Sequence, residues 1–218
     1  MDTGTQKFGG IKRISKYTEE NGDEDLHRFV NMVNKEVFLS SKRPTDIQIW
    51  LDLVDDCNEY YEELCIYHIS LMDDRAAASA FFSLVDALDE LQKLAPTPYK
   101  KVIKNLAARE SYSSWQLKIN RRKGNKCLRR TMKYRYDKGY DDYKDDIEGL
   151  LLMLRNSRQH SGKWIEEHFV SVVCQHFPKL LADLQKAMFE IRYLPNLYLK
   201  HSMGFLKEKG VSPQNRSD

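Results

Sequence analysis

The sequence has little of what several protein classes require. Its 218 residues include four cysteines without a C-x-x-C pair, six prolines and ten glycines. These counts exclude a secreted disulfide scaffold, a collagen-like repeat and a low-complexity chain. No apolar run approaches the roughly 18 residues that a membrane helix needs. The first ten residues lack the apolar stretch of a secretory signal.

The cysteines and histidines show no metal-ligand spacing. Neither H-E-x-x-H nor paired cysteines occur, so we expect no structural zinc, no catalytic metal and no cofactor. Free thiols indicate a reducing compartment, for which the cytoplasm is the first expectation and the nucleus the alternative.

Helical periodicity is present along most of the chain. Apolar residues recur at spacings of three and four from Leu26 to Ile191, which predicts a compact all-α fold of roughly seven helices. The segment 111–136 is less regular and is compatible with either a short strand pair or a helix that starts near Lys126. Polar side chains suggest N-caps, and a proline suggests the first turn of the last helix; these positions are Thr45 or Asp46, Asp73 or Asp74, Asp145 or Asp146, and Pro178.

Composition divides the chain into four segments. Residues 1–24 and 207–218 are polar and cannot bury enough apolar area to offset chain entropy. We therefore expect a flexible arm and a flexible tail there. Between them we expect an N-terminal helical annex (25–66) and a main helical domain (67–206).

Charge is segregated along the sequence, although the formal net charge is only +3. From Asp46 to Leu91, twelve acidic residues face one basic residue, whereas Tyr99 to Tyr136 contains thirteen basic residues and one acid. The basic stretch could hold phosphates. Alternatively, it pairs with the acidic half, within the chain or across a dimer.

One group of residues has a recognisable chemistry. Arg155, Asn156 and His160 lie within six residues of one another, and Asn156 and His160 share a helical face. An arginine grips a phosphate, a histidine delivers a proton near neutral pH, and an asparagine holds the ring in place. Metal-free RNA cleavage requires such groups. By itself, however, the pattern also fits an ordinary helix end.

The surrounding sequence resembles the kinase-extension nuclease (KEN) domain of the unfolded-protein-response sensor kinase/endoribonuclease and of ribonuclease L. The specific part is DDIEGLLLMLRNSRQH (145–160) followed by HFVSVVCQHFPKLLADLQKAM (168–188). The family reads DLL, matched here by Gly149-Leu150-Leu151, then RN, then three variable residues and H, then a helix that runs into FP and LL. A weaker likeness includes 75–91 and Trp115, so the resemblance covers about residues 68 to 200.

The resemblance implies a metal-independent endoribonuclease in which two nuclease domains pair. His160 matches the general acid, while Arg155 and Asn156 match the residues for phosphate contact and positioning. The family tyrosine is best matched by Tyr143, with Tyr136 and Tyr140 as competitors. RNA contacts are expected at the basic residues Lys126, Arg129, Arg130 and Lys133. The implied partners are RNA and a second KEN domain, in a homodimer or in a heterodimer with a sensor, without a membrane.

Several departures support an alternative interpretation. Ser161 replaces the family's aromatic residue, the loop after His160 is short, and the acidic YDDYKDDIE (140–148) adjoins the site. No glycine-rich loop, HRD or DFG is found, and the first 65 residues are too short for a kinase, so no kinase activity is expected. The chain could thus be a weak or inactive relative that binds RNA or a full-length sensor, or an unrelated helical interaction module.

Overall fold

The computed structural model describes residues 18–39, 43–110, 112–121, 126–160 and 163–194; within its helices, the side chains at 19–21, 121, 160 and 163–167 are not described. Most of the described residues are helical, and none of them lies in a strand. The all-α prediction is therefore confirmed for this part of the chain. The predicted tail (207–218) lies outside it, and α1 begins at Glu19, within the predicted arm. The division of the chain into domains stays a prediction.

The N-terminal elements pack around a small apolar cluster of their own. In chain order they are α1 (Glu19–Met32), the π-helical turn η1 (Val33–Val37), α2 (Thr45–Asp55) and α3 (Glu62–Ile66). The cluster contains the buried side chains of Leu51 and Leu64, and Phe29 of α1 meets Trp50 of α2 edge-on at 6.0 Å between ring centroids.

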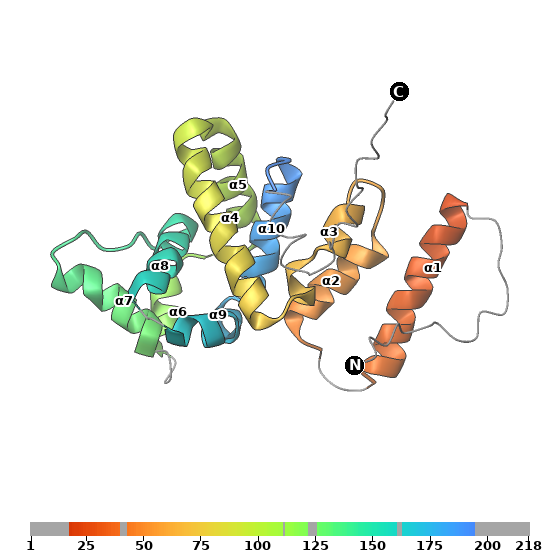
Figure 1. Cartoon of the computed structure of the whole chain (residues 1–218), viewed down its shortest axis with the longest axis horizontal. Helices are drawn as coiled ribbons and strands as arrows, with labels where there is room; N and C mark the ends of the chain where they lie inside the picture. Colours follow the sequence, from red (N-terminus) through yellow and green to blue (C-terminus); the bar gives the residue numbers. More distant parts are fainter. Residues whose placement is uncertain (1–17, 40–42, 111, 122–125, 161–162, 195–218) are drawn as a thin grey trace, which may run out of the picture.

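The larger core surrounds a long central helix. The elements that build it are the 3-10 turn η2 (Ile69–Leu71), α4 (Asp74–Leu94), α5 (Pro96–Arg109), α6 (Trp115–Arg121), α7 (Lys126–Asp137), α8 (Ile147–His160), α9 (Lys163–His176) and α10 (Leu180–Glu190). Helix α4 packs against α5, α8, α9 and α10. In Figure 1, α1 to α3 lie on one side of α4 and α10, and α6 to α8 lie on the other side.

The segment around η2 joins the two clusters. Gln185 of α10 is fully buried. Its Oε1 accepts from Ile69 N at 2.8 Å, and its Nε2 donates to Tyr67 O at 2.7 Å. The Gln185 side chain thus forms hydrogen bonds with two backbone groups, Tyr67 O and Ile69 N, in the segment that connects the small cluster to the large core.

The predicted helix starts are confirmed at two positions and wrong at two. Asp73 Oδ1 accepts from Ala76 N at 2.8 Å at the start of α4, and Asp146 Oδ1 accepts from Gly149 N at 2.8 Å at the start of α8. At α2 the N-cap is Pro44, in an extended conformation and without a side-chain cap. Pro178 lies in the turn before α10, where Leu180 N donates to Phe177 O at 3.1 Å.

Two further expectations about local structure are settled. The described residues of 111–136 form α6 and α7, so the strand-pair alternative is wrong and the helix from Lys126 is confirmed. Apolar residues also keep a helical spacing from Ile49 to Leu64, which predicts one long helix, but the structure does not form one there. The helix is interrupted between α2 and α3, where Cys57 N donates to Val54 O at 3.2 Å and Tyr61 N to Asn58 O at 2.9 Å in successive turns.

None of the helices in the described part of the chain is long and apolar enough to span a membrane.

Candidate functional site

The structure brings Tyr143 and Asn156 into contact. Asn156, on α8, donates through Nδ2 to the phenol oxygen of Tyr143 at 3.0 Å. The competing tyrosines lie at the surface, with exposed fractions of 75% for Tyr136 and 61% for Tyr140, whereas Tyr143 is buried at 7%. Of the three candidate tyrosines, Tyr143 is therefore the one that the fold places against a predicted site residue.

Helix α6 holds the backbone around Tyr143. The ring of Trp115 meets that of Tyr143 edge-on at 6.2 Å between centroids. The Trp115 indole N–H donates to Lys144 O at 2.9 Å, and Gln116 Nε2 donates to Tyr143 O at 2.6 Å. Because Trp115 is fully buried, these contacts tie the Tyr143 phenol to the hydrophobic core.

A glycine of α8 gives this backbone room to approach. A Cβ built on Gly149 would lie 2.0 Å from Lys144 O, far inside any real contact, and the atom it meets belongs to the backbone. The same carbonyl oxygen accepts from Trp115. Gly149, the first residue of the GLL match, is thus required by close packing of the segment before α8 onto the helix.

Two of the five acidic side chains in the segment 140–148 cap helices. Asp145 Oδ2 accepts from Ser114 N at 2.9 Å at the start of α6, and Asp146 caps α8. Carboxylates at helix N-termini are stabilised by the unpaired amides and the helix dipole. Asp141, Asp142 and Asp145 are exposed, and a capping carboxylate stays ionised, so the negative charge beside the site remains.

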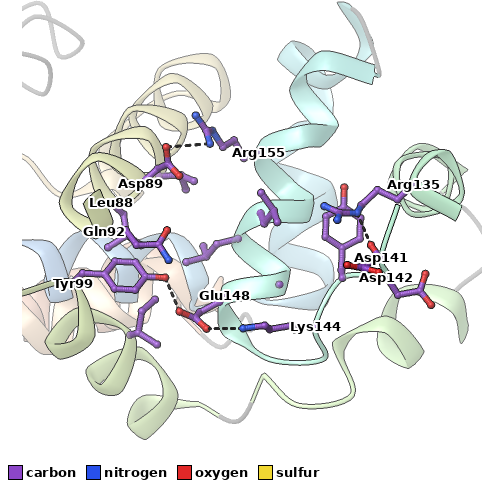
Figure 2. A pocket seen from close by; sticks show the side chains of 16 residues that line it. Leu88, Asp89, Gln92, Tyr99, Arg135, Asp141, Asp142, Lys144, Glu148 and Arg155 are labelled. Carbon is purple, nitrogen blue, oxygen red and sulfur yellow. Dashed lines mark hydrogen bonds and ion pairs between the residues drawn. The ribbon is translucent and has the colours of Figure 1, made fainter. Parts of the chain in front are cut away.

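Arg155 is directed away from Tyr143 and Asn156. Its Nε lies 2.9 Å from Asp86 Oδ1, and its Nη1 lies 3.4 Å from Asp89 Oδ2. Figure 2 shows the guanidinium turned toward Asp89 of α4. The pKa of Asp89 is lowered, first by its hydrogen bond to Lys93 and further by the positive charge of Arg155. The Arg155 guanidinium, which was predicted to contact a phosphate, is therefore paired with two carboxylates.

A different arginine covers the tyrosine. The guanidinium carbon of Arg135, on α7, lies 4.8 Å from the centroid of the Tyr143 ring, and its Nε donates to Asp141 O at 2.7 Å. Figure 2 shows Arg135 and Asp141 across α8 from Asp89. Sequence reasoning missed Arg135, although it ends the dense basic run. Its distance from Tyr143 depends on the irregular segment between them, which periodicity cannot place.

A cleft of about 360 Å³ extends over α8, from α4 and α5 on one side to the segment before α8 on the other. Arg135 and Tyr143 line one end and Arg155 lines it near α4. Its charged lining consists of three basic and four acidic side chains: Arg135, Lys144, Arg155, Asp89, Asp141, Asp142 and Glu148. The near balance of charge distinguishes this cleft from a simple anion site.

The four predicted RNA-contact residues lie on α7, which packs against α8. Lys126, Arg130 and Lys133 are exposed at spacings of four and three, so they share one face, whereas Arg129 is partly buried. Within the described parts of the chain, no ion pair joins these four to a carboxylate. A cationic face of this kind suits a phosphate backbone.

His160 is the last residue of α8, four residues after Asn156. Its side chain lies outside the described residues, as does Ser161. The general acid therefore stays a prediction.

The described residues contain no group of three or more His, Cys, Asp or Glu side chains arranged to hold a metal ion. Comparison of the chain with protein-family models, curated proteins and solved structures finds no match in any of the three.

Proposed function

We propose that this protein is a metal-independent endoribonuclease of the KEN type. The observation that carries the proposal is the 3.0 Å hydrogen bond between Asn156 and Tyr143. The sequence pattern points to both residues without fixing how they lie relative to each other. Tyr143 comes from the irregular segment before α8 and Asn156 from α8 itself. Their contact, beside the basic face of α7, supports the site that the resemblance implies.

The chemistry needs three actions. A base or hydrogen-bond partner at the ribose 2′-OH assists loss of its proton, and the 2′-oxygen attacks the adjacent phosphorus. An acid protonates the departing 5′-oxygen, leaving a 2′,3′-cyclic phosphate and a 5′-hydroxyl. We assign the first position to Tyr143, held by Asn156, and the acid to His160.

The cation that stabilises the phosphorane is the part in which two arginines compete. Arg155 is the residue of the family pattern, whereas Arg135 is the one that lies over Tyr143. Arg155 would have to leave Asp86 and Asp89 to reach a phosphate. We propose that Arg155 exchanges these carboxylates for an RNA phosphate when RNA binds. We further propose that the active form is a dimer in the cytoplasm or nucleus, with a role related to the unfolded protein response.

Cleavage of a short stem-loop RNA in EDTA, at increasing protein concentration, tests the proposal. We expect a rate that rises steeply with concentration and a cyclic-phosphate product. His160→Ala should abolish cleavage, and Tyr143→Phe should lower it by roughly 10²-fold, the scale of one positioned acid–base group.

Tyr140→Phe is the matched control, because it removes an exposed phenol three residues away and should leave the rate unchanged. Equal loss in the Tyr140 and Tyr143 variants, or cleavage that persists in His160→Ala, would rule out the assigned site. Circular dichroism of each variant separates loss of activity from loss of fold.

A second function is favoured by the ion pairs of Arg155. A site whose arginine is neutralised by two carboxylates fits a weak or inactive relative that binds RNA, or a sensor's nuclease domain, and modulates it. That function predicts RNA or sensor binding without turnover at any concentration.

A further inference from the structure

Two cysteines meet at the turn between α2 and α3, far in sequence from the predicted RNA site. Cys57 follows the end of α2, and Cys65 lies within α3. Their sulfur atoms are 3.1 Å apart, with the thiol of Cys65 donating to that of Cys57. Both residues are free cysteines. A disulfide bond joins sulfurs at about 2.05 Å, so closing it requires a movement of about 1 Å.

The two thiols differ in accessibility. Cys65 is buried at 8% exposure, and its sulfur also lies 3.6 Å from Leu53 O. Cys57 is partly exposed, with its sulfur 3.7 Å from Asn58 O in the turn. Burial and the hydrogen bond to Cys57 raise the pKa of the Cys65 thiol. An incoming reagent therefore meets Cys57 first and finds Cys65 directly behind it.

The turn that the cysteines enclose attaches the N-terminal helices to the large core. Its two tyrosines, Tyr60 and Tyr61, pack on Phe189 of α10 at ring-centroid distances of 5.2 and 5.9 Å. Lys186, one turn earlier on α10, lies 5.1 Å from the Tyr61 ring. A bond between residues 57 and 65 would close a ring around this contact.

We propose that Cys57 and Cys65 form an oxidation site that a low-molecular-weight disulfide, such as oxidised glutathione, converts to an intramolecular disulfide. The Cys57 thiolate attacks one glutathione sulfur, the glutathione S–S bond breaks, and one glutathione thiolate leaves. Cys65 then loses its proton to solvent and attacks the Cys57 sulfur, releasing the second glutathione. Two electrons and two protons pass from the protein to the oxidant, which becomes two reduced glutathione molecules.

The bridge would restrict the turn through which α2 and α3 hold α10. Closing a short loop lowers the entropy of the unfolded chain, so oxidation should raise the midpoint of thermal unfolding by about 5 °C. The site is independent of the proposed RNA chemistry, because no residue of that chemistry takes part in it.

The experiment uses the full chain with Cys127 and Cys174 replaced by serine, so that only the two cysteines in question remain. The reduced protein is incubated with oxidised glutathione at pH 8, quenched with iodoacetamide and analysed by intact mass and by non-reducing peptide mapping. We expect a product two hydrogen atoms lighter, resistant to alkylation, with the peptides of Cys57 and Cys65 joined. The wild-type chain should give the same joined peptides.

Single variants resolve the order of the steps. In Cys65→Ala, a glutathione adduct on Cys57 should persist, and Cys65→Ser serves as a second variant in case the smaller side chain impairs folding. In Cys57→Ser, Cys65 should react at least tenfold more slowly. A lasting adduct on Cys57 of the protein that retains both cysteines, or full alkylation of both thiols after oxidation, would overturn the proposal.

Tryptophan fluorescence provides a second readout in the folded state. The indole N–H of Trp50 donates to the backbone oxygen of Cys65 at 3.0 Å, so a disulfide at Cys65 should quench its emission. The quenching should reverse with dithiothreitol and be absent in Trp50→Phe. Unchanged emission upon complete bridging would overturn the inference that the bridge forms beside Trp50 in the folded protein.

Discussion

The carbonyl oxygen of Lys144 accepts a hydrogen bond from the indole N–H of Trp115. The same oxygen occupies the space that a Cβ atom on Gly149 would need. Two effects of opposite sign therefore meet at Gly149. Alanine favours a helix interior over glycine by about 1 kcal/mol. A methyl group 2.0 Å from a backbone oxygen cannot be accommodated by rotating a side chain, and such overpacking costs about 1–3 kcal/mol. The steric effect wins.

We accordingly predict that Gly149→Ala lowers the free energy of unfolding by up to about 2 kcal/mol and displaces Tyr143 from Asn156. Urea denaturation measures the first effect and RNA cleavage the second. Gly139→Ala is the control. The positive φ of 69° at Gly139 would strain an alanine there, but no atom lies within 4 Å of the Cβ that the substitution adds. It should cost about 1 kcal/mol and leave cleavage intact. A Gly149 variant as stable as the wild type would contradict the close approach.

Arg155 gives a second prediction at this scale. Asp86→Asn combined with Asp89→Asn removes both carboxylates that hold its guanidinium. We expect tighter binding of a non-cleavable 2′-O-methyl RNA, by roughly 3- to 10-fold, because the pair is partly exposed and surface ion pairs contribute little more than 1 kcal/mol. Fluorescence anisotropy measures the change.

Adding Arg155→Ala to that double variant should cancel the gain in RNA affinity, since the gain requires the released guanidinium. Asp52→Asn, an exposed carboxylate on α2, controls for the reduced negative charge. An equal gain from Asp52→Asn would indicate a general electrostatic effect in place of a released arginine.

At the scale of elements, the turn η2 carries a buried histidine between the two clusters. His68 is 1% exposed, and its Nδ1 accepts from Ser70 N at 3.3 Å. Burial lowers the pKa of His68 to about 4, and the charge of Lys186 contributes in the same direction. The unfolded chain binds this proton near pH 6.5 and the folded protein does not. Acid therefore favours unfolding in the window between these values.

We predict that stability is complete above pH 6.5 and falls by about 2 kcal/mol at pH 5 through His68. His68→Asn keeps an acceptor for Ser70 and should flatten the profile between pH 6.5 and 5, as measured by urea denaturation. His27→Asn is the contrasting variant. The pKa of His27 is raised by its hydrogen bond to Asp55, so its contribution is present below pH 6.5 and disappears as the pH rises. An unchanged slope in His68→Asn would contradict the buried neutral ring.

The elements also show where sequence patterns suffice and where they fail. Asp73 and Asp146 could be identified as caps because capping is local. The break between α2 and α3 could not, since Cys57, Tyr61 and Leu64 keep a helical spacing through a turn. The partners of Arg155 were equally hidden, because Asp86 lies 69 residues away and tertiary packing decides which side chains meet. The family resemblance alone assigns Asn156 and Tyr143 to one site, and no sequence pattern predicts the hydrogen bond between them.

At the scale of the whole molecule, the segregated charges affect binding strength and salt dependence together. If Lys126, Arg130 and Lys133 contact phosphates, the triple substitution to Gln should weaken RNA binding. It should also reduce the slope of log K against log salt concentration by about 2, since each single-strand phosphate contact contributes about 0.7. Titrations at several salt concentrations give the slope.

The triple variant Lys100→Gln, Lys101→Gln and Lys104→Gln on α5 removes the same charge from exposed positions. Its slope should stay close to that of the wild type. Equal slopes for the two triple variants would mean that RNA binding depends on the net charge of the protein and that α7 is not the contact surface.

The close packing of Lys144 on Gly149 has a consequence for activation. The Lys144 carbonyl is held from α6 and against α8, and Asp146 caps the same helix. These contacts, together with the hydrogen bond from Asn156, therefore hold Tyr143 against α8. If the proposed nuclease activity is regulated by a second subunit or an RNA strand, we expect the regulation to act on side chains outside these contacts. The side chain of Arg155, held by a neighbouring helix through ion pairs alone, is the part most easily switched.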